Sequence, residues 1–262
     1  MQKALEFFTI FGGVEWGKID TDKEPFELVK TLILDDYRYI RNDVSEMTTG
    51  MPLYHSILSG AALGDGRLHS TFKKANISED VGIKAVDELC ELGVIKLQNS
   101  KNSKKIIFNA PFIKFWFAFV SPLFKGVRDG DYKEVQDRFE KRFAEFVSYT
   151  FAQLSAELLK KEFQDDPIFS LKNYWDKDIE IDIYAKTKSK KVVVGSCNYT
   201  NSKLKKSTLT KLQEKATLAK LDAEIFVIFA KVGFSSELKT LKSKNIKLYT
   251  LKNFKRLVED ER

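Results

Sequence analysis

The sequence contains few residues of the kinds that build disulfide frameworks and metal sites. Its 262 residues include only two Cys and two His. Two cysteines cannot form a disulfide framework, and this set lacks the number and spacing of ligands that a zinc site needs. We therefore expect no bound metal and no resident cofactor, and we expect the protein in the cytoplasm.

Long hydrophobic runs are also missing. No stretch approaches the roughly 20 apolar residues that span a bilayer. The richest run, residues 112–120, is short and contains Lys114, and the N-terminal apolar run is too short for a signal peptide. Composition is that of a globular protein, with 43% hydrophobic and 31% charged residues. We expect no membrane partner.

A complete phosphate-binding loop is absent too. Residues 12–18 fit the frame G-x-x-x-x-G-K, but Ile19 occupies the position where Ser or Thr holds magnesium. Such a loop must also open a helix whose N–H groups hold the phosphates. Here the chain continues through acidic residues to Pro25. We do not expect an ATPase.

What the sequence does have is an uneven distribution of charge. The net charge is +7, yet residues 186–262 alone hold 19 Lys and Arg against 7 Asp and Glu. A basic C-terminal third predicts contact with a polyanion, such as DNA, or with an acidic partner. A solvated, Lys-rich surface would explain the same composition.

The apolar residues in 24–40 are spaced as in a helix. Residues 50–110 have the order of expected elements that is typical of a winged helix-turn-helix: helix, Gly-rich break, short helix, helix and two strands. In that segment Ser78 is a predicted N-cap and Gly93 a predicted left-handed C-cap. The predicted buried stripe of the last helix consists of Val81, Ala85, Val86, Leu89 and Cys90.

The negative charge of the expected recognition helix is unfavourable for binding DNA. This helix, residues 79–92, carries five acidic residues and only Lys84. Affinity for DNA comes mainly from cations that neutralise phosphates. The predicted wing is more basic, with Lys96, Lys101, Lys104 and Lys105. A role in packing or in binding a protein partner is the main interpretation, and DNA contact is the alternative.

The C-terminal half alternates in the manner of an α/β domain. One or two amphipathic helices are expected over residues 131–163. Strands are expected at residues 180–185, 191–199, 223–230 and 246–251, with helices at 204–221, 235–243 and 253–260. The continuous apolar run in 225–229 predicts a strand covered on both faces. We place the domains at 1–125 and 126–262.

The end of the second predicted strand has the position of a catalytic site but lacks the usual residues. A carboxylate on one strand facing Glu-x-Lys on the next is how restriction-type nucleases hold magnesium and activate water. Asp182 is such a carboxylate, but the Glu and Lys positions are Ser196 and Asn198, flanking Cys197.

Six segments in order resemble one family. They are FTIFGGV, PLYHSILSGAALG, PFIKFWFAFVSP, WDKDIEIDIYA, VVVGSCNYT and FAKVGFSSEL. Together they resemble the C-terminal region of archaeal-type AAA ATPases, a domain family of unknown function, here without the ATPase part. The resemblance implies an α+β chain: a helical winged helix-turn-helix followed by a PD-(D/E)XK restriction-endonuclease-like α/β domain.

The departures from this family concern the catalytic positions. Where the family has an acid in the preceding helix, this chain has Ala152, and Ser196 and Asn198 replace Glu and Lys. Glu180 and Asp182 are retained. Loss of a metal-binding carboxylate and the Lys removes most of the transition-state stabilisation. Residues of the following helix, including Lys205, Lys211, Glu214 and Lys215, could replace them, although a solvated helix face is the simpler interpretation.

We therefore predict a non-catalytic protein that binds nucleic acid or a partner through a degenerate nuclease-like domain. The expected nucleic-acid contacts are Lys203, Lys205, Lys206 and Lys211. A protein partner would bind through the winged helix. One alternative is a metal-dependent DNA endonuclease with migrated catalytic residues, which alone would need Mg²⁺. A second alternative is a protein-interaction module without a nucleic-acid role.

Overall fold

The computed structural model describes residues 1–101, 103–176 and 179–258. The chain forms two compact units: Lys3–Ala144, called the N-terminal unit, and Glu145–Arg262 with Met1–Gln2, called the C-terminal unit. The division lies inside one helix, α9 (Lys133–Glu162). Because a division within a helix does not locate a linker, the predicted domain boundary at 125/126 stays a prediction.

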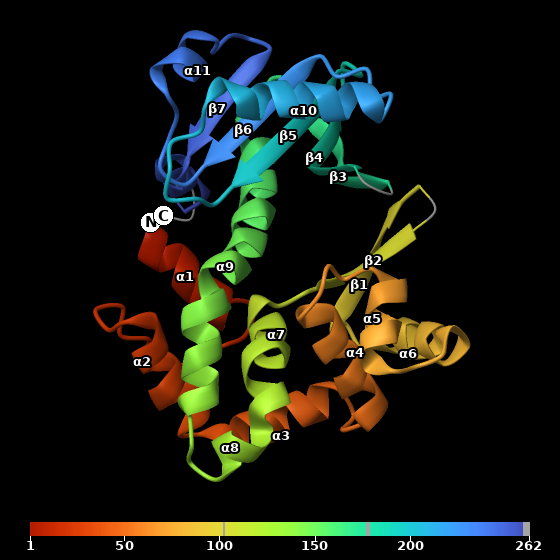
Figure 1. Cartoon of the computed structure of the whole chain (residues 1–262), viewed down its shortest axis with the longest axis vertical. Coiled ribbons are helices and arrows are strands. Elements are labelled where there is room, and N and C mark those ends of the chain that lie inside the picture. Colours follow the sequence, from red (N-terminus) through yellow and green to blue (C-terminus); the bar gives the residue numbers. More distant parts are fainter. Residues whose placement is uncertain (102, 177–178, 259–262) are drawn as a thin grey trace. The chain divides into compact units, whose positions relative to one another are not determined.

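The N-terminal unit is mainly helical (Figure 1). Its two strands, β1 (Ile95–Ser100) and β2 (Ser103–Phe108), form an antiparallel hairpin. Its helices are α1 (Gln2–Phe11), α2 (Pro25–Val29), the π-helix η1 (Lys30–Leu34), α3 (Tyr37–Met47), α4 (Pro52–Ala62), α5 (Leu68–Ala75), α6 (Glu79–Glu91), α7 (Pro111–Phe115), the π-helix η2 (Trp116–Val120), the 3-10 helix η3 (Ser121–Leu123), α8 (Phe124–Arg128) and the first part of α9.

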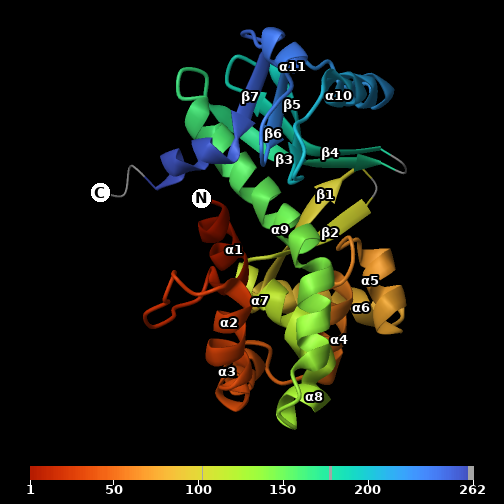
Figure 2. The ribbon, with the colours of Figure 1, turned by 60° about the vertical axis from the view of Figure 1, so that its left-hand side comes forward.

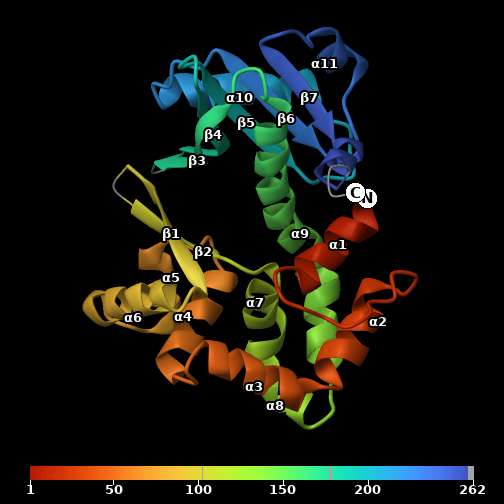
Figure 3. The same ribbon diagram turned by 180° about the vertical axis from the view of Figure 1, so that it is seen from behind.

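Three helices followed by a hairpin appear in residues 52–108, in the predicted order (Figure 3). Gly93 has the predicted left-handed conformation just after α6, with φ 72°. Ser78 is the N-cap residue of α6, but its side chain makes no capping hydrogen bond. The loop at residues 12–18 follows α1 instead of opening a helix, because the next helix begins only at Pro25.

The buried face of α6 differs from the prediction at two positions. Ala85, Val86 and Leu89 are buried as expected, but Val81 is 46% exposed and Cys90 is only half-buried. Gly82 is buried in place of Val81. The ring of Phe72 explains this, since a Cβ on Gly82 would lie 2.6 Å from it. At this point the helix needs a residue without a side chain.

Aromatic side chains build the core of the N-terminal unit. All residues from Phe112 to Val120 are buried, and even Lys114 is only 8% exposed. Phe139 stacks on Phe143 with ring centroids 4.1 Å apart, and Phe115 stacks on Phe119 at 4.9 Å. Burial, helped by the nearby Lys105, lowers the pKa of Lys114 to about 7.

The C-terminal unit contains a five-stranded sheet in which the strands lie in chain order, β3-β4-β5-β6-β7. β3 and β4 are antiparallel, as are β4 and β5, whereas β5, β6 and β7 are parallel. The sheet is therefore mixed, and the four predicted strands are adjacent as expected; β3 was not predicted. The elements are β3 (Ile168–Asp176), β4 (Ile179–Thr187), β5 (Val192–Asn198), α10 (Lys206–Leu218), β6 (Ile225–Ala230), α11 (Ser236–Thr240), β7 (Ile246–Thr250) and the 3-10 helix η4 (Leu251–Leu257).

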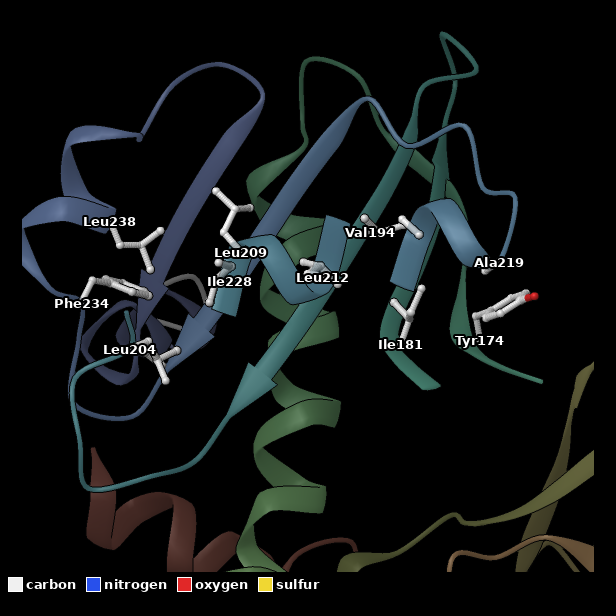
Figure 4. Close-up of a cluster of buried hydrophobic side chains, with 12 residues drawn as sticks. Tyr174, Ile181, Val194, Leu204, Leu209, Leu212, Ala219, Ile228, Phe234 and Leu238 are labelled. Atoms are coloured by element: carbon white, nitrogen blue, oxygen red, sulfur yellow. The ribbon is translucent and has the colours of Figure 1, made fainter. Parts of the chain in front are cut away.

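Helices cover both faces of this sheet. α10 lies on one face, and the second part of α9 lies on the other (Figures 1 and 2). Under α10, Leu209 and Leu212 pack against Val194 and Ile228 (Figure 4). On the α9 face, Phe151 stacks on Phe254 at 5.1 Å.

Strand β6 is buried on both sides, as its apolar sequence predicts: Val227, Ile228 and Phe229 are 0% exposed. The last predicted helix is a 3-10 helix in the described part, and residues 259–260 of that prediction lie outside the described residues. Across the described ranges, no helix is both long and apolar enough to cross a membrane.

Candidate functional site at the end of strand β5

A β-bulge in β4 positions Asp182. Lys172 of β3 pairs with Tyr184, and Tyr174 pairs with Ile181, so two steps along β3 correspond to three along β4. β4 therefore contains one extra residue at Asp182 or Ile183. Bulges redirect a side chain from the regular alternation and occur frequently beside active sites. Asn173 donates a 2.7 Å hydrogen bond to the backbone carbonyl of Asp182, which compensates for the interrupted ladder.

The redirected carboxylate binds backbone of the neighbouring strand. The N–H of Cys197 donates to Asp182 Oδ2 at 2.7 Å. Ile183 pairs with Gly195 in the same ladder, which brings Asp182 and Ser196 to the same end of the two strands. The structure thus brings the retained acid to the predicted position. The carboxylate tethers β5 to β4 at this end.

Ser196 and Asn198 contact each other. Asn198 Nδ2 donates to Ser196 Oγ at 2.9 Å. Because side chains alternate along a strand, these two residues share the face of Val194, the face covered by α10. Both side chains are neutral, so the pair supplies neither an anionic metal ligand nor a cation.

The opposite face carries Cys197, which lies against α9. Burial, with the nearby Asp182 carboxylate as a second cause, raises the pKa of the Cys197 thiol well above its usual value, and a hydrogen bond with Ser155 opposes the rise. Ser155 also donates to the carbonyl of Phe151 at 2.7 Å. Cys197 is therefore a protonated thiol at neutral pH and a poor nucleophile or metal ligand.

The other residues predicted for the catalytic site contribute little to the end of β5. Ala152 is half-buried on α9 and offers only a methyl group. Glu180 is exposed on β4. Lys215 of α10 donates to the backbone carbonyl of Glu180 at 3.0 Å, so one of the residues considered as a replacement does reach β4. Within the described residues, no three His, Cys, Asp or Glu side chains are grouped so that they could hold a metal.

The four predicted nucleic-acid contacts are exposed. Lys203 and Lys205 precede α10, Lys206 begins it and Lys211 lies within it. Lys206 Nζ lies 3.7 Å from Glu237 Oε1, in an exposed ion pair of small energetic value. The predicted wing is less basic on its surface than its sequence suggests, because Lys105 is only 7% exposed.

Lys231 joins this basic edge although it was not predicted. Its Nζ donates to Asn201 Oδ1 at 2.8 Å and lies 4.5 Å from the centroid of the Tyr199 ring. Asn198 pairs with Ala230 at the carboxyl ends of β5 and β6. Since parallel neighbours end at the same edge of a sheet, the residue after β6 is brought beside the loop after β5. The parallel pairing of β5 with β6 is the signal from which the position of Lys231 could have been predicted.

One protein-family model matches part of the chain. Residues 116–212 match DUF234, described as archaea bacterial proteins of unknown function. This match confirms the resemblance to an archaeal domain family of unknown function and is consistent with the C-terminal region of archaeal-type ATPases. No curated protein matches the chain.

One solved structure is similar over much of the chain. It is a refined half-complex from a tetradecameric assembly of Thermococcus gammatolerans McrB AAA+ hexamers with bound McrC. The identity is 11%, the TM-score is 0.27, and the aligned part covers 80% of this chain and 52% of that one. The chain thus spans about half the length of that protein, and a likeness at this TM-score supports no conclusion about function.

Proposed function

Because residues 116–212 match a family whose function is unknown, we propose a function from the site itself: the protein binds nucleic acid or a protein partner and does not cleave phosphodiesters. The observation that carries this proposal is the pairing of Ser196 with Asn198 at 2.9 Å. A neutral serine–amide pair stands where a nuclease needs a carboxylate and a Lys. Asp182 holds the backbone of Cys197 at the same place.

We further propose that the C-terminal unit is a degenerate PD-(D/E)XK-like domain. Its mixed sheet, with an antiparallel β3-β4-β5 part and α10 connecting the parallel strands β5 and β6, supports this assignment. In the N-terminal unit, α4, α5, α6 and the β1–β2 hairpin support a winged helix. The proposed domains are residues 1–125 and 126–262.

The proposed nucleic-acid surface consists of Lys203, Lys205, Lys206 and Lys211. Their exposure supports it, because phosphate contacts need cations that reach solvent. Lys203→Glu, Lys205→Glu and Lys206→Glu together should weaken binding to duplex DNA and flatten its salt slope by roughly 0.9 per lost contact. The matched control is Lys96→Glu, Lys101→Glu and Lys104→Glu, three exposed residues of the hairpin. Equal losses in both variants would contradict the assignment.

A metal-dependent endonuclease is the first alternative. The contact of Lys215 Nζ with the Glu180 carbonyl favours it, because it shows that a cation from α10 reaches the strand of the retained acids. Plasmid cleavage with Mg²⁺ or Mn²⁺ tests it on wild type, Asp182→Ala and Lys215→Ala. We expect no cleavage by any of them. Cleavage by wild type that both substitutions abolish would establish the endonuclease.

A protein-interaction module is the second alternative. α6 favours it, because this acidic helix exposes two apolar side chains, Val81 at 46% and Ile83 at 41%. Such a surface suits a partner with basic and apolar groups better than it suits DNA. If wild type shows no retention of DNA even at low salt, this alternative replaces nucleic-acid binding.

A further inference from the structure

A large cleft lies within the N-terminal unit. Its volume is about 1210 Å³, and its lining comes from α3, α4, α5, the segment from Trp116 to Phe124 and the first part of α9. Pockets for small molecules usually measure roughly 300–1,000 Å³. The cleft is thus larger than a small ligand needs. It involves none of the residues considered at the end of β5.

The lining of this cleft is positively charged. Glu134 and Asp137 are the acidic residues among its lining residues. The basic ones are Arg41, Lys74, Arg138, Lys141 and Arg142. Five cations against two carboxylates give a balance of +3. In the described part of the chain, no carboxylate lies within ion-pair distance of Arg41 or Lys141, so these two charges are available to a ligand.

Neighbouring cations are the second cause of the lowered pKa of two lining residues, after burial. The pKa of His55 is lowered by burial and then by the charge of Arg41. The pKa of Arg138 is lowered by burial and then by the charge of Arg142. Neighbouring cations that disfavour one another are relieved by an anion between them. Arg138 is also fixed in place, because its guanidinium donates to the Ala118 carbonyl at 3.0 Å.

The cleft also offers hydroxyl groups and an exposed aromatic ring. Ser45 and Ser59 line it, and their hydroxyls can donate to phosphate oxygens. Phe124 also lines the cleft and is 43% exposed. A basic groove beside an exposed aromatic ring is the combination with which proteins bind single strands, since cations follow the phosphates and the ring stacks on a base.

We propose that this cleft binds a single strand of nucleic acid. Arg41, Lys74 and Lys141 contact successive phosphates, and Phe124 stacks on a base. The distribution of the cations over α3, α5 and α9 fits an extended polyanion better than one compact phosphate group. A duplex has its bases already stacked and is bound less tightly. This proposal goes beyond the one above, because it concerns another unit and other residues.

The test measures fluorescence anisotropy of a labelled oligo(dT) of about 20 nucleotides over a salt series. Arg41→Gln, Lys74→Gln and Lys141→Gln together remove three cleft charges. The matched control, Lys18→Gln, Lys30→Gln and Lys84→Gln, removes three exposed charges of the same unit outside the cleft. We expect the cleft variant to bind more weakly, with a salt slope smaller by about 2, or roughly 0.7 for each lost contact. The control should retain wild-type binding.

Phe124→Ala separates nucleic acid from other polyanions. It should weaken oligo(dT) binding several-fold without changing the salt slope, because stacking involves no counterion release. Polyglutamate should compete poorly. Equal losses in the cleft and control variants, effective competition by polyglutamate with Phe124→Ala unchanged, or loss of single-strand binding only in the Lys203, Lys205 and Lys206 variant would each overturn the proposal.

Discussion

Asp182 and Cys197, fifteen positions apart, are joined by a 2.7 Å hydrogen bond from the Cys197 N–H to the Asp182 carboxylate. In a nuclease of this arrangement the carboxylate would face a metal ion. Here it stabilises the pairing of β4 with β5. A residue that resembles a catalytic acid in the sequence therefore has a structural contact, and its substitution should change stability.

We expect Asp182→Ala to lower the free energy of unfolding by about 1.5–3 kcal/mol, the range for a hydrogen bond to a charged group. Asp182→Asn should cost less, because the amide oxygen can still accept from Cys197. Urea denaturation measures both. The control is Glu180→Ala, an exposed position on the same strand. A loss for Glu180→Ala as large as that for Asp182→Ala would argue against the contact.

Calorimetric titration with Mn²⁺ should give no stoichiometric binding to wild type, because Ser196 and Asn198 are neutral and bonded to each other. The double substitution Ser196→Glu and Asn198→Lys restores the missing carboxylate and cation. We expect it to create Mn²⁺ binding that Asp182→Ala removes again. Tight stoichiometric binding by wild type would refute the degenerate site.

The Cys197 thiol should react faster with iodoacetamide when the Asp182 charge is removed. After burial, that carboxylate is the next cause of the raised thiol pKa. In a Cys90→Ser background, Asp182→Asn should shift the pH profile of alkylation to lower pH. Because local opening would raise the rate at every pH, the position of the profile is the informative measurement, and an unchanged position would contradict the electrostatic cause.

Lys114→Met should raise the free energy of unfolding at pH 7. Burial lowers the pKa of Lys114 from 10.5 to about 7, so between these values the unfolded state binds more protons than the folded state. Stability therefore rises as pH increases from about 7 to 10.5, by at most about 1.4 kcal/mol per pH unit. The Met variant should lose this pH dependence, whereas Lys84→Met, at an exposed site, should keep it.

Gly82→Ala should destabilise the N-terminal unit by about 1–3 kcal/mol, the usual cost of overpacking. The added Cβ would lie 2.6 Å from the Phe72 ring. Val81→Ala, at the exposed neighbouring position, should change the free energy of unfolding by less than about 0.5 kcal/mol. Thermal denaturation of the two variants measures this difference. Similar melting temperatures would show that the Phe72 ring moves to accommodate the added Cβ.

Much of the fold was predictable because local patterns were strong. The continuous apolar run of β6 predicted a strand buried on both faces, and Gly93 was predicted as a left-handed C-cap. Both predictions are confirmed. The burial of Gly82 in place of Val81 was not predictable, because it depends on a Phe72 ring contributed by another helix. β3 was missed because its sequence, IFSLKNYWD, is mostly half-buried and lacks a clear apolar alternation.

The candidate site was predictable in position but not in its contacts. Sequence placed Asp182 beside the end of β5, and the register confirms this. The hydrogen bond to Cys197 depends on one extra residue in β4, which is detectable only when both strands are aligned. Lys231 was missed for the same reason: its neighbours belong to a loop thirty residues earlier in the chain.

The order of the strands has a consequence for folding. Because β3 to β7 lie side by side in the order in which the chain is synthesised, each strand can dock on one that already exists. β3 and β4 are close in the sequence and pair antiparallel, so they can pair first. Addition of β6 must wait for α10 to cross the sheet, and loop closure makes such parallel pairing slower. Until β6 docks, the partner edge of β5 is unpaired, and an unpaired edge is a place where another chain can add a strand.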